Sequence, residues 1–181
     1  MGGLEGNKEM GQTLREKLHW DTQSGQITDA DRRYLMLRAD VLMGIFRKLE
    51  PQAQAQALAA FGQAVRESGG KSAQSYFQSQ HNDAPRFLQT MEAYSAELGW
   101  GKWAFNQNTP GQWELIVHNS PFAAGFGASE KPVCSAIAGM LSAVGTLIAQ
   151  APVSVEETAC AAQGCKHCKF VLRTNKASDP P

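Results

Sequence analysis

The sequence predicts an α+β fold in which an antiparallel sheet packs with helices. Three observations lead to this prediction. The first half of the chain carries apolar residues at helical spacing, and the second half carries short runs in which polar and apolar residues alternate. An uncharged stretch over residues 132–155 interrupts these runs and is typical of a buried helix. With 181 residues, we expect a lead-in over residues 1–13, one ligand-binding domain over 14–174 and a tail over 175–181.

The predicted elements begin with two β-leaning runs in residues 19–37, which meet at a turn at Ser24-Gly25. Asp40 is expected to cap a helix, and a second helix is expected to start at Pro51 and to end at Gly69-Gly70. The first of these helices should bury one face, formed by Val41, Leu42, Ile45, Phe46 and Leu49.

A shorter helix should carry Tyr76 and Phe77, and Asn82-Asp83 before Pro85 indicates the start of another. This last helix has an apolar stripe made of Phe87, Met91, Tyr94 and Leu98.

Strands dominate the predicted second half. The runs KWAF (102–105) and WELIVH (113–118) form a hairpin with a loop over 106–111, and residues 120–132 are expected to form a loop rich in glycine. A buried helix over 133–149 follows, and then strands over 153–157 and 166–174. Period two places Trp113, Leu115 and Val117 on one face of their strand.

The charge balance argues against several classes of partner. Seventeen basic and seventeen acidic residues give no net charge, so we expect no nucleic-acid partner. The uncharged stretch contains polar residues, two glycines and a proline near its end, so we expect no membrane span. The polar first residues resemble no secretory signal, and a reducing cytoplasmic location is therefore expected.

The segment VEETACAAQGCKHCKF (155–170) holds three of the four cysteines. Strand periodicity points Glu157 inward with two valines, and it points Cys168 inward with Phe170 and Leu172. A buried carboxylate beside thiolates is costly unless a metal ion neutralises them. With Cys160 in the turn and Cys134 at the first turn of the buried helix, a closed structural zinc site is the leading interpretation.

Other interpretations of this segment remain open. Cys160, Cys165 and Cys168 have the spacing of a plant-type iron–sulfur loop, although the remaining Cys134 lies upstream rather than downstream. The pair Cys165-x-x-Cys168 could be a redox motif, but it enters a strand instead of opening a helix. A disulfide, or four cysteines with no shared role, are further alternatives.

The stretches FGASEKPVC (126–134) and VEETACAAQGCKHCKF resemble the 4-vinyl-reductase-type domain, which also forms the N-terminal sensor of phenol- and xylene-responsive activators. The similarity extends over roughly residues 14–173. In the aromatic-sensing members a zinc is held by Cys and then Glu-x2-Cys-x7-Cys. This pattern falls on Cys134, Glu157, Cys160 and Cys168 and leaves Cys165 out.

The resemblance implies a fold shared with haem-NO sensor domains and transport-particle subunits, and it implies a homodimer. It also implies a site for a small hydrophobic or aromatic ligand, in a stand-alone sensor or carrier. The phenol-contacting residues of the sensors cannot be matched one to one. The candidates for ligand contacts here are Trp103, Trp113, His118, Phe122 and Phe126.

Two other functions remain open at this stage. The family name points to an accessory or reductase-associated role in (bacterio)chlorophyll and tetrapyrrole synthesis. The sequence contains neither a dinucleotide fingerprint nor a G-x4-G-K-[ST] loop, so binding is expected rather than catalysis. The other alternative is a dimeric assembly module whose interior is filled by its own side chains.

Overall fold

The computed structural model describes residues 13–109 and 112–174. The chain divides into two compact units, with the boundary between Met36 and Leu37. The lead-in expected over residues 1–13 and the tail over 175–181 lie outside the described residues, apart from Thr13. The single domain expected over 14–174 stays a prediction.

The first unit contains a short helix and a three-stranded antiparallel sheet in the order β1-β2-β3. Its elements are α1 (Leu14–Lys17), β1 (His19–Asp21), β2 (Gln26–Asp29) and β3 (Arg32–Tyr34). Thr13 and Glu16 form a capping box that starts α1. The β-leaning runs expected here are confirmed, and a third strand is added because Asp29 pairs with Arg32 across the turn at 2.6 Å.

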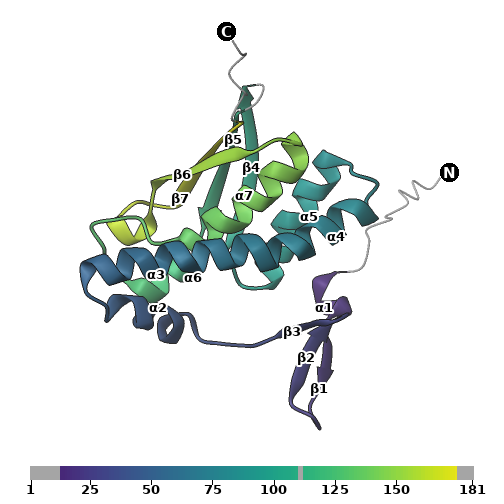
Figure 1. Cartoon of the computed structure of the whole chain (residues 1–181), viewed down its shortest axis with the longest axis horizontal. Coiled ribbons are helices and arrows are strands. Elements are labelled where there is room, and N and C mark those ends of the chain that lie inside the picture. Colours follow the sequence, from purple (N-terminus) through teal and green to yellow (C-terminus); the bar gives the residue numbers. More distant parts are fainter. Residues whose placement is uncertain (1–12, 110–111, 175–181) are drawn as a thin grey trace, which may run out of the picture. The chain divides into compact units, whose positions relative to one another are not determined.

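The second unit packs helices against a four-stranded antiparallel sheet in the order β4-β5-β7-β6 (Figure 1). Its elements are α2 (Ala39–Arg47), α3 (Pro51–Ala64), η1 (Val65–Gly69), α4 (Gly70–Ser79), α5 (Ala84–Glu97), β4 (Lys102–Thr109), β5 (Gln112–His118), α6 (Pro121–Phe126), α7 (Ser135–Ala149), β6 (Val153–Ala159), η2 (Ala161–Gln163) and β7 (Cys168–Thr174). This is the α+β architecture that the sequence predicted.

The helix α7 lies between the sheet and the long α3–η1–α4 segment (Figure 1). At the crossing of α3 and α7, a Cβ atom on Gly139 would lie 2.0 Å from the carbonyl oxygen of Gly62. Only glycine allows the two backbones to approach this closely. Because α7 is held so near α3, its first residue and the preceding Cys134 are fixed above β6 and β7.

The predicted face of α2 is wrong in part. Phe46 and Met43 are buried, but Val41, Ile45 and Leu49 are 50%, 57% and 37% exposed. The apolar spacing was compatible with burial of either side of the helix, and packing against α6 selected one side.

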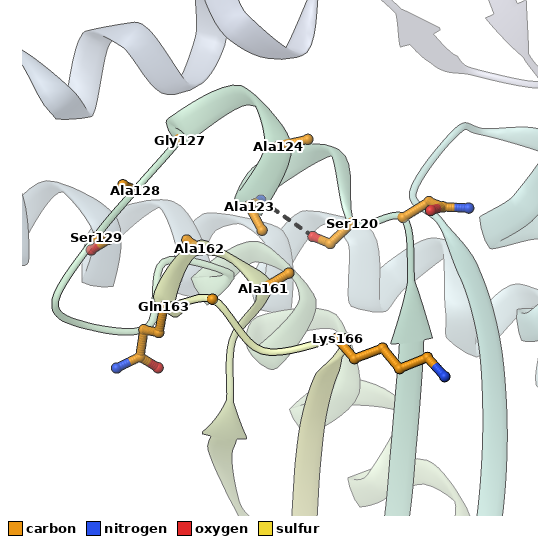
Figure 2. A pocket seen from close by; sticks show the side chains of 12 residues that line it. Ser120, Ala123, Ala124, Gly127, Ala128, Ser129, Ala161, Ala162, Gln163 and Lys166 are labelled. Carbon is orange, nitrogen blue, oxygen red and sulfur yellow. Dashed lines mark hydrogen bonds between the residues drawn. The ribbon is translucent and has the colours of Figure 1, made fainter.

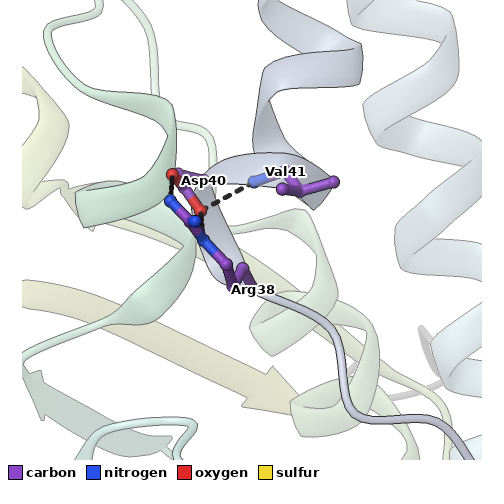
Figure 3. Close-up of polar contacts among 3 residues, drawn as sticks. All are labelled: Arg38, Asp40 and Val41. Carbon is purple, nitrogen blue, oxygen red and sulfur yellow. Dashed lines mark hydrogen bonds and ion pairs between the residues drawn. The ribbon is translucent and has the colours of Figure 1, made fainter.

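Asp40 does not cap α2. Arg38 occupies the cap position without a capping side-chain bond, and the Asp40 carboxylate pairs with the Arg38 guanidinium and accepts from the Val41 N–H (Figure 3). The Arg38 hydrogen bond, followed by its charge, lowers the pKa of Asp40. The carboxylate is exposed, so this pair contributes little stability.

Three other predicted boundaries also differ. The helix that starts at Pro51 does not end at Gly69-Gly70, because a π-helical turn, η1, carries it into α4. Strand β4 continues through the expected loop to Thr109, while residues 110 and 111 lie outside the described residues. The expected glycine-rich loop contains α6.

Other predictions are confirmed. Asp83 caps α5 by accepting from the Arg86 N–H, and α5 buries Phe87, Met91 and Tyr94, while Leu98 at its end is 40% exposed. In the part of the chain that the structure describes, no helix is long and apolar enough to cross a membrane.

Candidate metal centre

Four side chains from three separate segments meet beneath the first turn of α7. They are Cys134, Glu157, Cys160 and Cys168, and one ligand atom from each lies within 4.8 Å of the others. Cys134 is the residue that precedes α7, Glu157 lies on β6, Cys160 follows β6 and Cys168 opens β7. All three cysteines have no exposed surface.

The sheet register explains how β6 and β7 bring their ligands together. Phe170 faces Glu157 across the two strands, and one residue further along the partner strand Lys169 faces Ala159. The skipped residue is a β-bulge, which bends the end of β6. Beyond the bulge the chain turns through η2 and returns at Cys168, so Cys160 and Cys168 come to lie under the same helix end.

The sulfur atoms are spaced as a small tetrahedral ion requires. The Sγ of Cys134 lies 3.9 Å from the Sγ of Cys160 and 3.6 Å from that of Cys168. A tetrahedral ion with bonds of about 2.3 Å to sulfur places two sulfurs about 3.8 Å apart. The spacing therefore fits an ion of the size of zinc.

The carboxylate of Glu157 is only half used by protein groups. Its Oε2 accepts from the backbone N–H of Cys134 at 3.0 Å. Its Oε1 is buried without a hydrogen-bond partner among the described residues. A buried oxygen with no donor is costly, and a cation among the three sulfurs would provide the missing partner.

The electrostatics of the four groups point in the same direction. Burial, with a further contribution from Cys160, raises the pKa of Glu157 to about 8. Hydrogen bonds to Cys160 and Cys168 raise the pKa of Cys134, and hydrogen bonds from Cys134 and Cys160 lower that of Cys168. Without a cation, Glu157 and Cys134 therefore keep protons that they would lose more readily in water.

Two hydrogen bonds connect the sulfurs to their surroundings. The hydroxyl of Ser120, which is 3% exposed, lies 3.3 Å from Cys134 Sγ. The N–H of Ala161 donates to Cys168 Sγ at 3.3 Å. Sequence reasoning missed Ser120, although Ser followed by Pro is a recognised helix start.

The fourth cysteine and the predicted histidine lie elsewhere. Cys165 is exposed and is not a member of the cluster. Gly164 before it has a φ of 87°, which glycine adopts without strain and which ends the η2 turn. His118 is exposed, and its ring contacts that of His167 at a centroid distance of 5.3 Å.

The other predicted ligand contacts are mostly part of the core. Trp103, Phe122 and Phe126 are at most 5% exposed, and Trp113 is partly buried against the same cluster. The Phe122 ring meets that of Trp100 edge-on, with centroids 5.1 Å apart, and that of Phe61 at 6.0 Å. Trp100 and Phe61 are aromatic neighbours that the sequence prediction did not include.

A hollow of about 720 Å³ lies between α6 and the η2 turn, outside the metal ligands. Figure 2 shows its small side chains on both walls, with Ser120 at its inner side and Lys166 at its rim. Its lining does not include the predicted aromatic residues. The hollow and the aromatic cluster therefore lie on different sides of α6.

The segment that carries β5, α6, α7 and the last two strands also matches a known family. Residues 113–174 match the family model of the 4-vinyl-reductase domain. The resemblance expected from the metal-ligand pattern is thereby confirmed, and the match includes all four clustered residues. None of the curated proteins compared with the chain matches it.

Solved structures extend this likeness to the fold of most of the chain. The phenol-responsive sensory domain of the transcription activator PoxR, solved with phenol, is 17% identical with a TM-score of 0.76, over 92% of this chain and 89% of that one. Trafficking protein particle complex subunit 3 from Naegleria fowleri, covalently bound to palmitic acid, is 9% identical with a TM-score of 0.55, over 76% and 95%.

An H-NOX protein from S. oneidensis is 16% identical with a TM-score of 0.50, over 80% of this chain and 81% of that one. At these identities the likeness concerns the fold. The protein thus has the mixed helical and antiparallel fold that the family resemblance implied, shared with H-NOX domains and trafficking-particle subunits.

Proposed function

We propose that this protein is a zinc-stabilised domain of the 4-vinyl-reductase type, spanning residues 14–174, that binds a small hydrophobic or aromatic molecule as a sensor or carrier. The observation that carries the proposal is the position of α6. This helix touches the metal ligands through Ser120 and places Phe122 and Phe126 in an aromatic interior. The likeness to a phenol-responsive sensory domain supports the same class of ligand.

Zinc is the proposed metal because three thiolates and one carboxylate match its preference for sulfur and oxygen in a closed tetrahedron. The bound ion would neutralise the thiolates and the Glu157 carboxylate and so join α7 to the β6–β7 hairpin. The three cysteines are fully buried, which favours a structural role over a catalytic one. A reducing cytoplasmic compartment would keep these thiols available as ligands.

The proposed ligand site is the aromatic interior beneath α6, around Trp100, Trp103 and Phe122. These rings contact one another or shared neighbours, so a ligand would enter by displacing α6 rather than by filling an open cavity. The same filled interior also favours the second candidate function, a dimeric assembly module that binds no ligand. The two functions differ in whether an aromatic probe reaches these rings.

The proposed homodimer would use the exposed face of α2. Val41 and Ile45 lie one turn apart on this helix, Leu49 follows just beyond its end, and all three are exposed. An apolar stripe of this kind, left open to solvent, commonly marks a protein–protein contact. A second copy of the chain is the proposed partner.

The metal is tested by elemental analysis and native mass spectrometry of gently purified protein. We expect one zinc per chain, a sharp loss in Cys160→Ser, and no change in Cys165→Ser. The second variant is a matched control because it removes an exposed thiol from the same turn region. Iron with acid-labile sulfide, or equal metal loss in both variants, would refute the proposed ligand set.

The ligand is tested by titrating phenol into the zinc-loaded protein and following the indole N–H signals by NMR. We expect the signals of Trp100 and Trp103 to shift with saturation. That of Trp20, which lies in the first unit and is 52% exposed, should stay in place as an internal control. Phe122→Leu should weaken phenol binding about three- to tenfold by removing a ring contact. Shifts that never saturate, or that affect all indoles alike, would favour the assembly module.

A further inference from the structure

Ser120 is a buried side chain that makes two hydrogen bonds in opposite directions. Its Oγ accepts from the backbone N–H of Ala123 at 3.4 Å, which caps the first turn of α6 (Figure 2). The same Oγ lies 3.3 Å from Cys134 Sγ. Because the N–H can only donate, the single hydroxyl proton is left for the sulfur.

The helix α6 needs such an anchor because it is short. It has six residues, too few for a helix to be stable by itself. At its other end the carbonyl oxygen of Phe126 accepts from the Arg47 guanidinium at 3.2 Å. Between these ends Gly125 packs directly on the α2 backbone, because a Cβ there would lie 2.5 Å from the Ala39 oxygen. The position of α6 thus depends on contacts at both ends.

We propose that Ser120 is a positioning residue that couples the metal centre to α6, with its hydroxyl holding the Cys134 sulfur and the first turn of α6 at the same time. This inference rests on the proposed metal centre and deepens it. A metal-bound thiolate carries negative charge and is a stronger acceptor than a thiol. Metal binding therefore strengthens the Ser120 bond and orders α6.

The coupling is reciprocal in free energy. Whatever metal binding contributes to the order of α6, an ordered α6 contributes to metal affinity. The opposite wall of the hollow is tied to the centre in a similar way, since Ala161 donates to Cys168 Sγ. A bond from Ser129 N–H to the Ala162 oxygen at 2.9 Å joins the two walls. Metal occupancy therefore sets the position of the helix that carries Phe122, the proposed ligand contact.

The experiment is hydrogen exchange by mass spectrometry on the full chain, with zinc bound and after chelation. In the wild type, chelation should speed exchange in the peptide 119–127 roughly tenfold or more, the range of a lost hydrogen bond to a charged group. A peptide from α5, over 84–97, should change much less. In Ser120→Ala, the α6 peptide should already exchange fast with zinc bound, and chelation should add little.

Ser135→Ala is the matched control. Ser135 lies next to Cys134 on the other side, and its buried hydroxyl has no hydrogen-bond partner among the described residues. This variant should behave as the wild type. Ser120→Thr keeps the hydroxyl and should restore protection of α6.

Cobalt in place of zinc gives a second readout that a merely structural role would not move. Loss of a hydrogen bond to a metal-bound thiolate raises the energy of the sulfur electrons, so the sulfur-to-cobalt charge-transfer band should shift to longer wavelength in Ser120→Ala. It should not shift in Ser120→Thr or Ser135→Ala.

The results separate the two proposals. A wild type that takes up neither zinc nor cobalt would refute the metal centre and this coupling together. Normal metal binding, with Ser120→Ala indistinguishable from Ser135→Ala in exchange and absorption, would overturn the coupling alone. So would Ser120→Thr behaving as the alanine variant.

Discussion

Removal of the Glu157 charge should flatten the dependence of stability on pH in the metal-free protein. The perturbation is Glu157→Gln, with Glu156→Gln as the matched control. Glu156 is the preceding residue on β6, is exposed and pairs with Arg173 at 3.2 Å. Both variants remove one carboxylate from the same strand, but only Glu157 lies among the sulfurs.

The magnitude follows from the environment of the Glu157 carboxyl. Burial raises its pKa from the usual 4.5 to about 8, and a tenfold change in proton affinity corresponds to about 1.4 kcal/mol. The metal-free fold is thus destabilised by at most on the order of 5 kcal/mol once this carboxyl has ionised. Because the folded form holds the proton more tightly, unfolding releases it, and stability falls as pH rises from 4.5 to about 8.

The assay is urea unfolding of chelated protein at several pH values between about 4.5 and 8.5. Relative to Glu157→Gln, the wild type should lose several kcal/mol across this interval, and Glu156→Gln should follow the wild type. With zinc bound the trend should reverse, since ligand deprotonation favours the metal. Parallel pH profiles for the wild type and Glu157→Gln would refute the electrostatic account of the site.

Two further predictions concern packing and assembly. Gly139→Ala should lower the free energy of unfolding by about 1–3 kcal/mol or more, because its Cβ would collide with the Gly62 carbonyl; urea unfolding measures this, and an unchanged midpoint would contradict the close approach of α3 and α7. Ile45→Glu should convert the proposed dimer to monomer in analytical ultracentrifugation, while Glu67→Gln, an exposed change on η1, should not; a monomeric wild type would refute the dimer.

The sequence was sufficient for features that depend on local geometry. Alternation on β6 and β7 correctly directed Glu157 and Cys168 inward, because strand side chains alternate strictly between two faces. Pro51 and Asp83 marked the starts of α3 and α5, since each acts on its own backbone. These local rules predicted most of the elements and indicated which side chains to test as metal ligands.

Other features were decided only by tertiary packing. The six residues of α6 are too few to show helical periodicity, so their sequence appeared to be a loop. The apolar spacing in α2 fits burial of more than one face, and contact with α6 determined that Ile45 is exposed. Ser120 is fourteen residues from Cys134, and no local rule connects a serine to a distant thiol. The closure of the sheet under α7 brings them within 3.3 Å, because distances between segments depend on how the whole core packs.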